Sequence, residues 1–168
     1  RDSVASRGLG DVYKRQDTHC HLDAAEFAGE EDLIATRALQ ENVGMIVIPA
    51  VARDNFATVA GLAHQHGNCT YALGIHPIFV PQAQESDLAV LREAVEAAMN
   101  DTRFVALGEI GLDFFVPMLT TPEMREKQEF FYSEQLKIAR DFGLPVLLHV
   151  RKSQDSILKY LRRIQVIG

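Results

Sequence analysis

The chain has 168 residues, of which 47% are hydrophobic and 24% charged, and its formal net charge is −6. This composition is typical of a folded globular protein and excludes disordered, collagen-like and disulfide-scaffold chains. The acidic balance argues against a broad sequence-independent nucleic-acid surface, which is normally basic. It still permits a local phosphate site whose positive charge comes from metal ions.

Cysteine content and hydropathy indicate the compartment. The two cysteines, Cys20 and Cys69, are too few for a disulfide framework, so we expect a cytoplasmic protein. No apolar run approaches the ~20 residues that cross a bilayer, and the first 16 residues lack the apolar core of a signal peptide. We therefore expect no membrane partner and no obligate protein partner.

Short apolar runs recur along the chain and predict strands. One strand is implied just before His19, and the others are predicted at residues 45–50, 70–74, 103–108 and 144–150. Their apolar character is nearly continuous, as in parallel strands that are covered on both faces.

Helical patterns fill the gaps between these strands, at residues 31–41, 54–67, 87–99, 122–142 and 153–164. Asp54, Ser86 and Thr121 stand where N-caps are expected, and Pro122 suits a first helical position. Gly67 and Gly143 suit the left-handed position that follows a helix end.

Alternating strands and helices predict an α/β fold built from βαβ units. Five units are present, whereas a closed (β/α)8 barrel takes about 250 residues. We therefore predict an incomplete TIM (β/α)8-type barrel over residues 17–168, truncated at the C-terminus. Residues 1–16 are predicted to be a non-native or disordered extension, because Lys14 and Arg15 are costly inside a buried strand.

Metal-ligand residue types stand at the predicted strand ends. His19 and His21 are two residues apart, so on a strand both side chains point to one face. Glu109 follows the fourth strand, and His149 ends the fifth. Since the carboxyl ends of parallel strands share one face, we expect these four side chains to converge on a metal site.

Other residues of these types are interpreted structurally. His64 and His66 fall in the last turn of a predicted helix, where histidine favours the negative helix end. Residues two apart on a helix do not face each other, so this pair is a poor metal site. Strand alternation points Cys20 away from its neighbouring histidines, which favours packing over a nucleophilic role.

Four motifs together carry a family resemblance. Asp-Thr-His-Cys-His, Gly-Ile-His-Pro, Gly-Glu-Ile-Gly-Leu-Asp and Pro-Val-Leu-Leu-His-Val-Arg follow one another, starting at residues 17, 74, 108 and 145. In this order they resemble the TatD family of metal-dependent deoxyribonucleases, within the amidohydrolase-like metallo-hydrolases. The spacing of Gln128 and Gln135 in the fourth predicted helix fits as well.

The resemblance implies a centre of two divalent ions, with Mg, Mn and Zn as candidates. His19 and His21 would bind one ion, Glu109 would bridge it to the second, and His149 would bind the second. His76 and Arg151 would contact or orient the substrate phosphate. Together with Glu109 they form the implied catalytic set.

The resemblance also implies the reaction, which is hydrolysis of DNA phosphodiester bonds, commonly as a 3′–5′ exonuclease that acts on 3′ ends. Asp113 is implied as a substrate-site residue that supports the glutamate loop. The family supplies a further histidine and an aspartate after its sixth and eighth strands, positions beyond Gly168. We therefore expect the 168-residue chain alone to bind metal weakly and to show little nuclease activity.

Two alternatives remain open. In the first, the same metallo-hydrolase scaffold acts on a small-molecule amide, ester or lactone, because a fold does not fix its substrate. The fourth strand offers Glu109 rather than a carbamylatable lysine, which favours the deoxyribonuclease type of site. A non-catalytic barrel domain is the other alternative, and it predicts no metal-dependent turnover.

Overall fold

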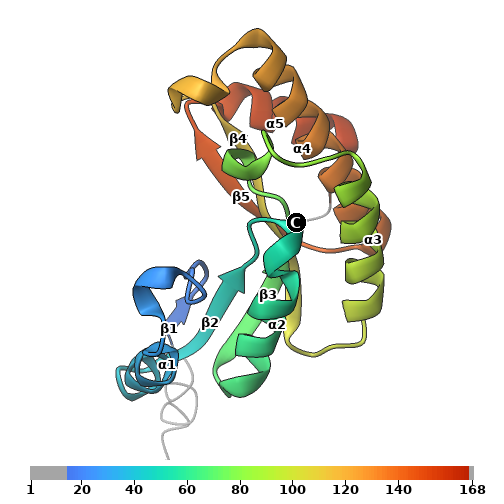
Figure 1. Ribbon diagram of the computed structural model, residues 1–168. Coiled ribbons are helices and arrows are strands. Elements are labelled where there is room, and N and C mark those ends of the chain that lie inside the picture. Colours follow the sequence, from blue (N-terminus) through green and yellow to red (C-terminus); the bar gives the residue numbers. More distant parts are fainter. Residues whose placement is uncertain (1–14, 167–168) are drawn as a thin grey trace, which may run out of the picture.

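A computed structural model describes residues 15–166, in which five parallel strands form one sheet. The strand order in the sheet is the order in the chain, β1-β2-β3-β4-β5. The sheet curls into a half-barrel with helices along its outer side, as Figure 1 shows. The predicted α/β class and incomplete barrel are confirmed. The strands are β1 (Arg15–Asp17), β2 (Val43–Pro49), β3 (Cys69–Leu73), β4 (Phe104–Asp113) and β5 (Val146–Arg151).

Each strand of the described chain is followed by helical structure. Short 3-10 turns lie near the carboxyl ends of the first four strands, at η2 (Ala25–Phe27), η3 (Arg53–Asn55), η4 (Pro77–Phe79) and η5 (Pro117–Leu119). The longer helices are α1 (Glu31–Gln40), α2 (Phe56–Gln65), α3 (Ser86–Ala98), α4 (Pro122–Phe142) and α5 (Gln154–Ile164). None of the described helices is long and apolar enough to span a membrane.

The core has two parts, one on each face of the sheet. The larger part lies between the sheet and the helices and contains buried residues such as Ile48, Leu107 and Tyr132. The smaller part is on the inner face, where Val47, Ala72 and Ala106 pack together. Strands covered on both faces explain the continuous apolar runs in the sequence.

The edge strands depart from this pattern. Every residue of β1 is exposed, and β5 is half-buried with exposed residues at its end. Both strands lie at an edge of the described sheet, so each has a neighbouring strand on one side alone. The apolar run at 144–150 predicted full coverage, and this is wrong within the described residues.

Strand β4 is longer than the sequence suggested. The apolar run predicted an end at Gly108, but the strand continues to Asp113 and pairs with β5 from Leu107 onward. The glutamate motif is therefore part of the sheet rather than a loop. Backbone pairing with β5 holds this extension, which matters for the site.

Two predicted N-caps are wrong. The Asn55 side chain, not Asp54, accepts backbone N–H bonds from Val51 and Ala52 at the start of α2. Ser86 is the first residue of α3 and makes no capping bond, while Asp87 accepts the N–H of Gln84.

Of the other predicted helix ends, two are confirmed and one is wrong. Thr121 accepts the N–H of Met124, and Gly143 is left-handed at φ +64°, so both are confirmed. Gly67 is not left-handed, because α2 ends at an extended His66.

The predicted extension falls mostly outside the described residues. Residues 1–14 lie outside them, so that part of the prediction stays a prediction. Arg15 and Gln16 belong to β1 and pair with Val43 and Met45 of β2.

Candidate metal centre

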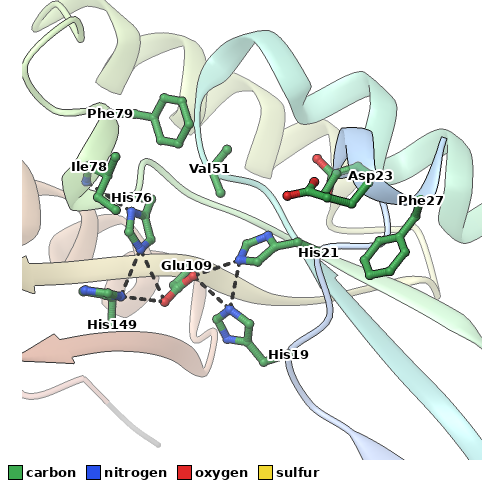
Figure 2. A pocket seen from close by; sticks show the side chains of 12 residues that line it. His19, His21, Asp23, Phe27, Val51, His76, Ile78, Phe79, Glu109 and His149 are labelled. Carbon is green, nitrogen blue, oxygen red and sulfur yellow. Dashed lines mark hydrogen bonds and ion pairs between the residues drawn. The ribbon is translucent and has the colours of Figure 1, made fainter.

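A pocket of about 740 Å³ opens at the carboxyl ends of the strands. Figure 2 shows that four histidines and Glu109 meet on one side of it. Phe27, Val51, Ile78 and Phe79 form an apolar wall around them. The structure thus brings together the four residues predicted as metal ligands, and it adds His76. They are His19, His21, Glu109 and His149.

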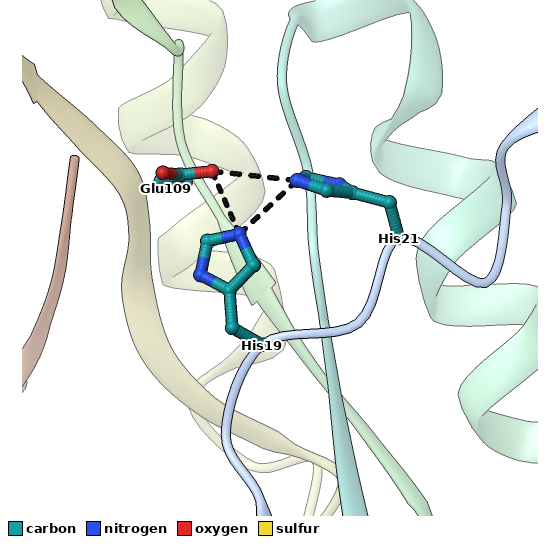
Figure 3. A group of neighbouring side chains, drawn as sticks. All are labelled: His19, His21 and Glu109. Atoms are coloured by element: carbon teal, nitrogen blue, oxygen red, sulfur yellow. Dashed lines mark hydrogen bonds and ion pairs between the residues drawn. The ribbon is translucent and has the colours of Figure 1, made fainter.

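The first group of ligand-type residues comes from the end of β1 and from β4. The Nε2 atoms of His19 and His21 lie 2.9 Å and 3.4 Å from Oε2 of Glu109. The two Nε2 atoms are 3.1 Å apart. Figure 3 shows both rings pointing at the same carboxylate oxygen. Two imidazoles and a carboxylate in this arrangement are a common set of ligands for a divalent ion.

The second group is on the other side of the same carboxylate. His149 Nδ1 lies 3.1 Å from Oε1 of Glu109, and His76 Nε2 lies 3.5 Å from that oxygen. His76 Nε2 and His149 Nδ1 are 3.0 Å apart. In each group the ligand atoms all lie within 4.8 Å of one another, close enough to share an ion.

Glu109 is the centre of the arrangement, with one oxygen facing each group. Glu109 as a whole residue is only 4% exposed to solvent. Burial alone would raise the pKa of its carboxyl, but hydrogen bonds with His149, His21 and His76 outweigh burial and hold the pKa well below its usual range. The carboxylate is therefore charged, and a buried negative charge among imidazoles suits a cation.

The histidines respond to that charge. Hydrogen bonding with Glu109 raises the pKa of His21 above its ordinary value. Burial lowers the pKa of His149, but hydrogen bonds with Glu109 and Asp113 outweigh burial and raise it overall. A metal ion would replace these protons, because a ligating imidazole is neutral. The donor set and its charge therefore fit one or two divalent ions, without selecting among Mg, Mn and Zn.

Backbone geometry fixes Glu109. Its N–H donates to the carbonyl of Ala50 at 3.1 Å, across β3 from β4. The Gly108–Glu109 peptide bond is cis, and the pairing of β4 with β5 is irregular between Leu107 and Ile110. At Gly111, with φ +149°, a Cβ atom would lie 2.0 Å from the carbonyl oxygen of His149. Only glycine allows β4 and β5 to approach this closely here.

The two remaining predicted site residues lie beside the pocket rather than in its lining. Asp113 is 0% exposed and is engaged by groups of the chain itself. Arg151 is exposed; its guanidinium lies 4.0 Å from Asp113 Oδ2 and 4.0 Å above the ring of Phe115. Burial leaves no free face on Asp113 for a substrate.

Sequence reasoning missed how α4 supports the site. Gln135 accepts the N–H of Ile75 at 2.7 Å and donates to its carbonyl at 3.1 Å, next to His76. Gln128 accepts the N–H of Asp113 at 2.9 Å and donates to the carbonyl of Leu119. Both glutamines are buried, and their place on the apolar stripe of the helix is the signal that the sequence offered.

The other candidates lie away from the pocket lining. His64 Nε2 is 3.3 Å from Asp101, and His66 Nδ1 is 3.2 Å from Asp32, so these two histidines have separate acidic neighbours. Cys20 is half-buried and packs against the larger core. The structural interpretation of all three is consistent with these positions.

The chain is similar to known proteins over most of its length. The family model "TatD related DNase" matches residues 16–167. A hydrolase from Escherichia coli K12, named "Uncharacterized metal-dependent hydrolase YjjV", is 40% identical over 147 residues, covering 88% of this chain and 54% of the relative. Human "Deoxyribonuclease TATDN3" is 32% identical over 153 residues, covering 87% and 55%.

A solved structure agrees with the fold. The crystal structure of the E. coli TatD homologue YjjV has a TM-score of 0.84 and 37% identity, over 92% of this chain and 57% of that chain. The chain thus spans just over half the length of the relatives it matches.

Parallel strands curled into part of a barrel, with histidines and a carboxylate at their carboxyl ends, define the barrel-type metal-dependent hydrolases. Within that class, the chain belongs to the TatD-related deoxyribonuclease family. The family resemblance drawn from the four sequence motifs is confirmed.

Proposed function

We propose that the whole protein is a metal-dependent deoxyribonuclease that hydrolyses phosphodiester bonds from the 3′ ends of DNA. The observation that carries this proposal is the position of Glu109, whose two oxygens face separate histidine pairs. Family membership and the deoxyribonuclease name of the human relative support the choice of DNA as substrate.

In this proposal the chain holds two ions. His19, His21 and Oε2 of Glu109 would hold the first, and His149 with Oε1 of Glu109 would hold the second. When bound, two such ions would supply a hydroxide nucleophile near neutral pH and would neutralise developing charge on the phosphate oxygens. The chain's own part is to fix the ligand atoms and to keep Glu109 ionised.

His76 and Arg151 are proposed to act on the phosphate. The N–H of Ile78 donates to Nδ1 of His76 at 3.1 Å, so neutral His76 carries its proton on Nε2. That nitrogen is then a hydrogen-bond donor, which suits a phosphate oxygen better than a metal ion. The exposed Arg151 fork offers two parallel donors to a phosphate that reaches the pocket edge.

The test compares the whole protein and the 168-residue chain on 5′-labelled single-stranded DNA with Mg²⁺, Mn²⁺ or Zn²⁺. We expect a ladder of products shortened from the 3′ end, and much slower cleavage by the 168-residue chain. Glu109→Gln keeps the shape but removes the charge, so it should abolish both cleavage and tight metal binding.

Control substrates separate the alternatives. A panel of small esters, amides and lactones is assayed beside DNA with the same metals. Turnover of a small ester without cleavage of DNA would replace the proposal with the small-molecule hydrolase. Metal-dependent turnover of neither substrate class by the whole protein would favour the non-catalytic domain.

A further inference from the structure

Asp113 is a buried carboxylate whose two oxygens have separate partners. Oδ1 accepts the backbone N–H groups of Phe115 at 2.9 Å and Val116 at 3.0 Å. Oδ2 lies 3.1 Å from Nε2 of His149. The side chain of Gln128 also holds the Asp113 backbone at 2.9 Å. The carboxylate can therefore neither rotate freely nor reach a substrate.

This contact determines which nitrogen of His149 can bind a metal ion. An ionised carboxylate can only accept hydrogen bonds, so Nε2 of His149 must be the donor. The nitrogen left for a metal ion is then Nδ1. That atom faces Glu109 Oε1 at 3.1 Å, inside the second group of ligand-type residues.

The other nitrogen of the ring is Nδ1, which lies 3.0 Å from Nε2 of His76 and 3.1 Å from Oε1 of Glu109. Because Glu109 is ionised, Nδ1 of a ring without a bound ion also donates to Oε1. A divalent ion bound beside Oε1 would displace that proton and leave the Nε2–H on Asp113.

We propose that Asp113 is a positioning residue that keeps the proton of His149 on Nε2 and directs Nδ1 at the metal ion. The proposal deepens the proposed metal centre and rests on it, but it does not depend on DNA being the substrate. Pairs of a carboxylate and a ligating histidine raise the basicity of the ring and fix its orientation.

Asp113→Asn is the decisive variant because of the two N–H groups on Oδ1. The amide oxygen must take the Oδ1 position to accept them, which leaves the NH₂ group facing His149 Nε2. An NH₂ group donates, so Nε2 becomes the acceptor and the proton moves to Nδ1. The variant has almost the same size and hydrogen-bonding geometry, but it blocks the ligand atom.

Asp87→Asn is a matched control. Asp87 is also buried, accepts a backbone N–H from Gln84 at 2.9 Å and pairs with Arg53 at 2.9 Å. It is not among the residues that line the metal pocket. This control therefore reproduces the loss of a buried carboxylate without touching His149.

The first measurement is nitrogen-15 NMR of the imidazole rings in the whole protein saturated with Zn²⁺. We expect zinc on Nδ1 and the proton on Nε2 of His149 in the unmodified protein and in Asp87→Asn, and loss of this pattern in Asp113→Asn. Zinc on Nε2, or no zinc on His149, in the unmodified protein overturns the proposal, even if the variant fails to fold.

The second measurement is calorimetric titration of the whole protein with Zn²⁺ or Mn²⁺ alone. Changes in the shell around metal ligands typically weaken binding about 10–100-fold, and we expect a loss of this size for Asp113→Asn. The Asp87→Asn protein should bind as the unmodified protein does. Unchanged affinity in Asp113→Asn contradicts the proposal, whereas absent DNA cleavage with normal metal binding contradicts the proposed substrate alone.

Discussion

The carboxylate of Glu109 depends on the backbone beside it, and Gly111 shows this most directly. Gly111 lies two residues beyond Glu109 on β4, and any Cβ there would collide with the carbonyl oxygen of His149 on β5. We predict that Gly111→Ala lowers the free energy of unfolding by about 1–3 kcal/mol or more, because overpacked backbone must shift. Denaturant titration measures the loss.

Gly61 supplies the matched control. It lies inside α2, and a Cβ there would meet nothing within 4 Å. Alanine costs less conformational entropy than glycine in a helix, so Gly61→Ala should raise the free energy of unfolding by about 0.5–1 kcal/mol. Equal effects of the two substitutions would contradict the importance of the close approach between β4 and β5.

The two cysteines offer a second prediction at the residue scale. Burial is the main reason that the pKa of Cys69 rises to about 11, and it also raises the pKa of the half-buried Cys20. Few thiolates exist near neutral pH, so both should react slowly with iodoacetamide in the folded chain, and Cys69 more slowly than Cys20. Peptide mapping over time measures both rates; faster labelling of Cys69 would show that it is not buried.

At the scale of elements, α4 acts on the site through two buried glutamines. Gln135→Met retains the volume but leaves the N–H and carbonyl of Ile75 without partners. Each buried unsatisfied group costs about 1–3 kcal/mol, so we predict a clear loss of stability and a displaced His76. Thermal unfolding and the NMR signal of His76 measure these effects. Gln135→Glu keeps an acceptor for the N–H, and equal losses in both variants would contradict this account.

Asp87 connects α3 to η3 and makes stability depend on pH. Burial alone would raise its pKa, but hydrogen bonds from the Gln84 N–H and the Arg53 guanidinium outweigh burial and lower the pKa. A lowered pKa in the folded state stabilises the fold at pH values above about 4, which is the pKa of aspartate in the unfolded chain. This contribution is lost as the pH falls through the lower pKa of the folded state. Asp87→Asn should therefore unfold with a shallower dependence on acid below about pH 4.

Local sequence predicted the elements well and their ends poorly. Periodicity and apolar runs depend on neighbouring residues, so the order of strands and helices and the four metal-ligand candidates were accessible. The extension of β4 to Asp113 was not, because it follows from pairing with β5, a segment far along the chain. The bonds from Gln128 and Gln135 to the strand ends depend on tertiary placement in the same way.

Across the whole molecule, the described sheet has two open edges. Unpaired edge strands are templates for pairing with another chain. We predict that the apparent mass of the 168-residue chain rises with concentration, as measured by light scattering. Val150→Lys places a charge on the exposed end of β5 and should reduce this association.

Leu158→Lys is the control for that experiment. Leu158 is an exposed apolar residue of α5, comparable to Val150 in exposure, at 44% against 39%, but it is not in a strand. If both substitutions reduce association equally, exposed apolar surface rather than the strand edge is responsible.

The match between strand order and chain order has a consequence for synthesis. A ribosome releases β1 first, so His19 and His21 leave the exit tunnel about 90 residues before Glu109 and 130 before His149. During that interval the nascent chain carries two imidazoles at metal-binding spacing without the carboxylate that completes the set. Each later unit is added to the growing edge, and the second group of ligand-type residues gains His149 only after the fifth strand has paired.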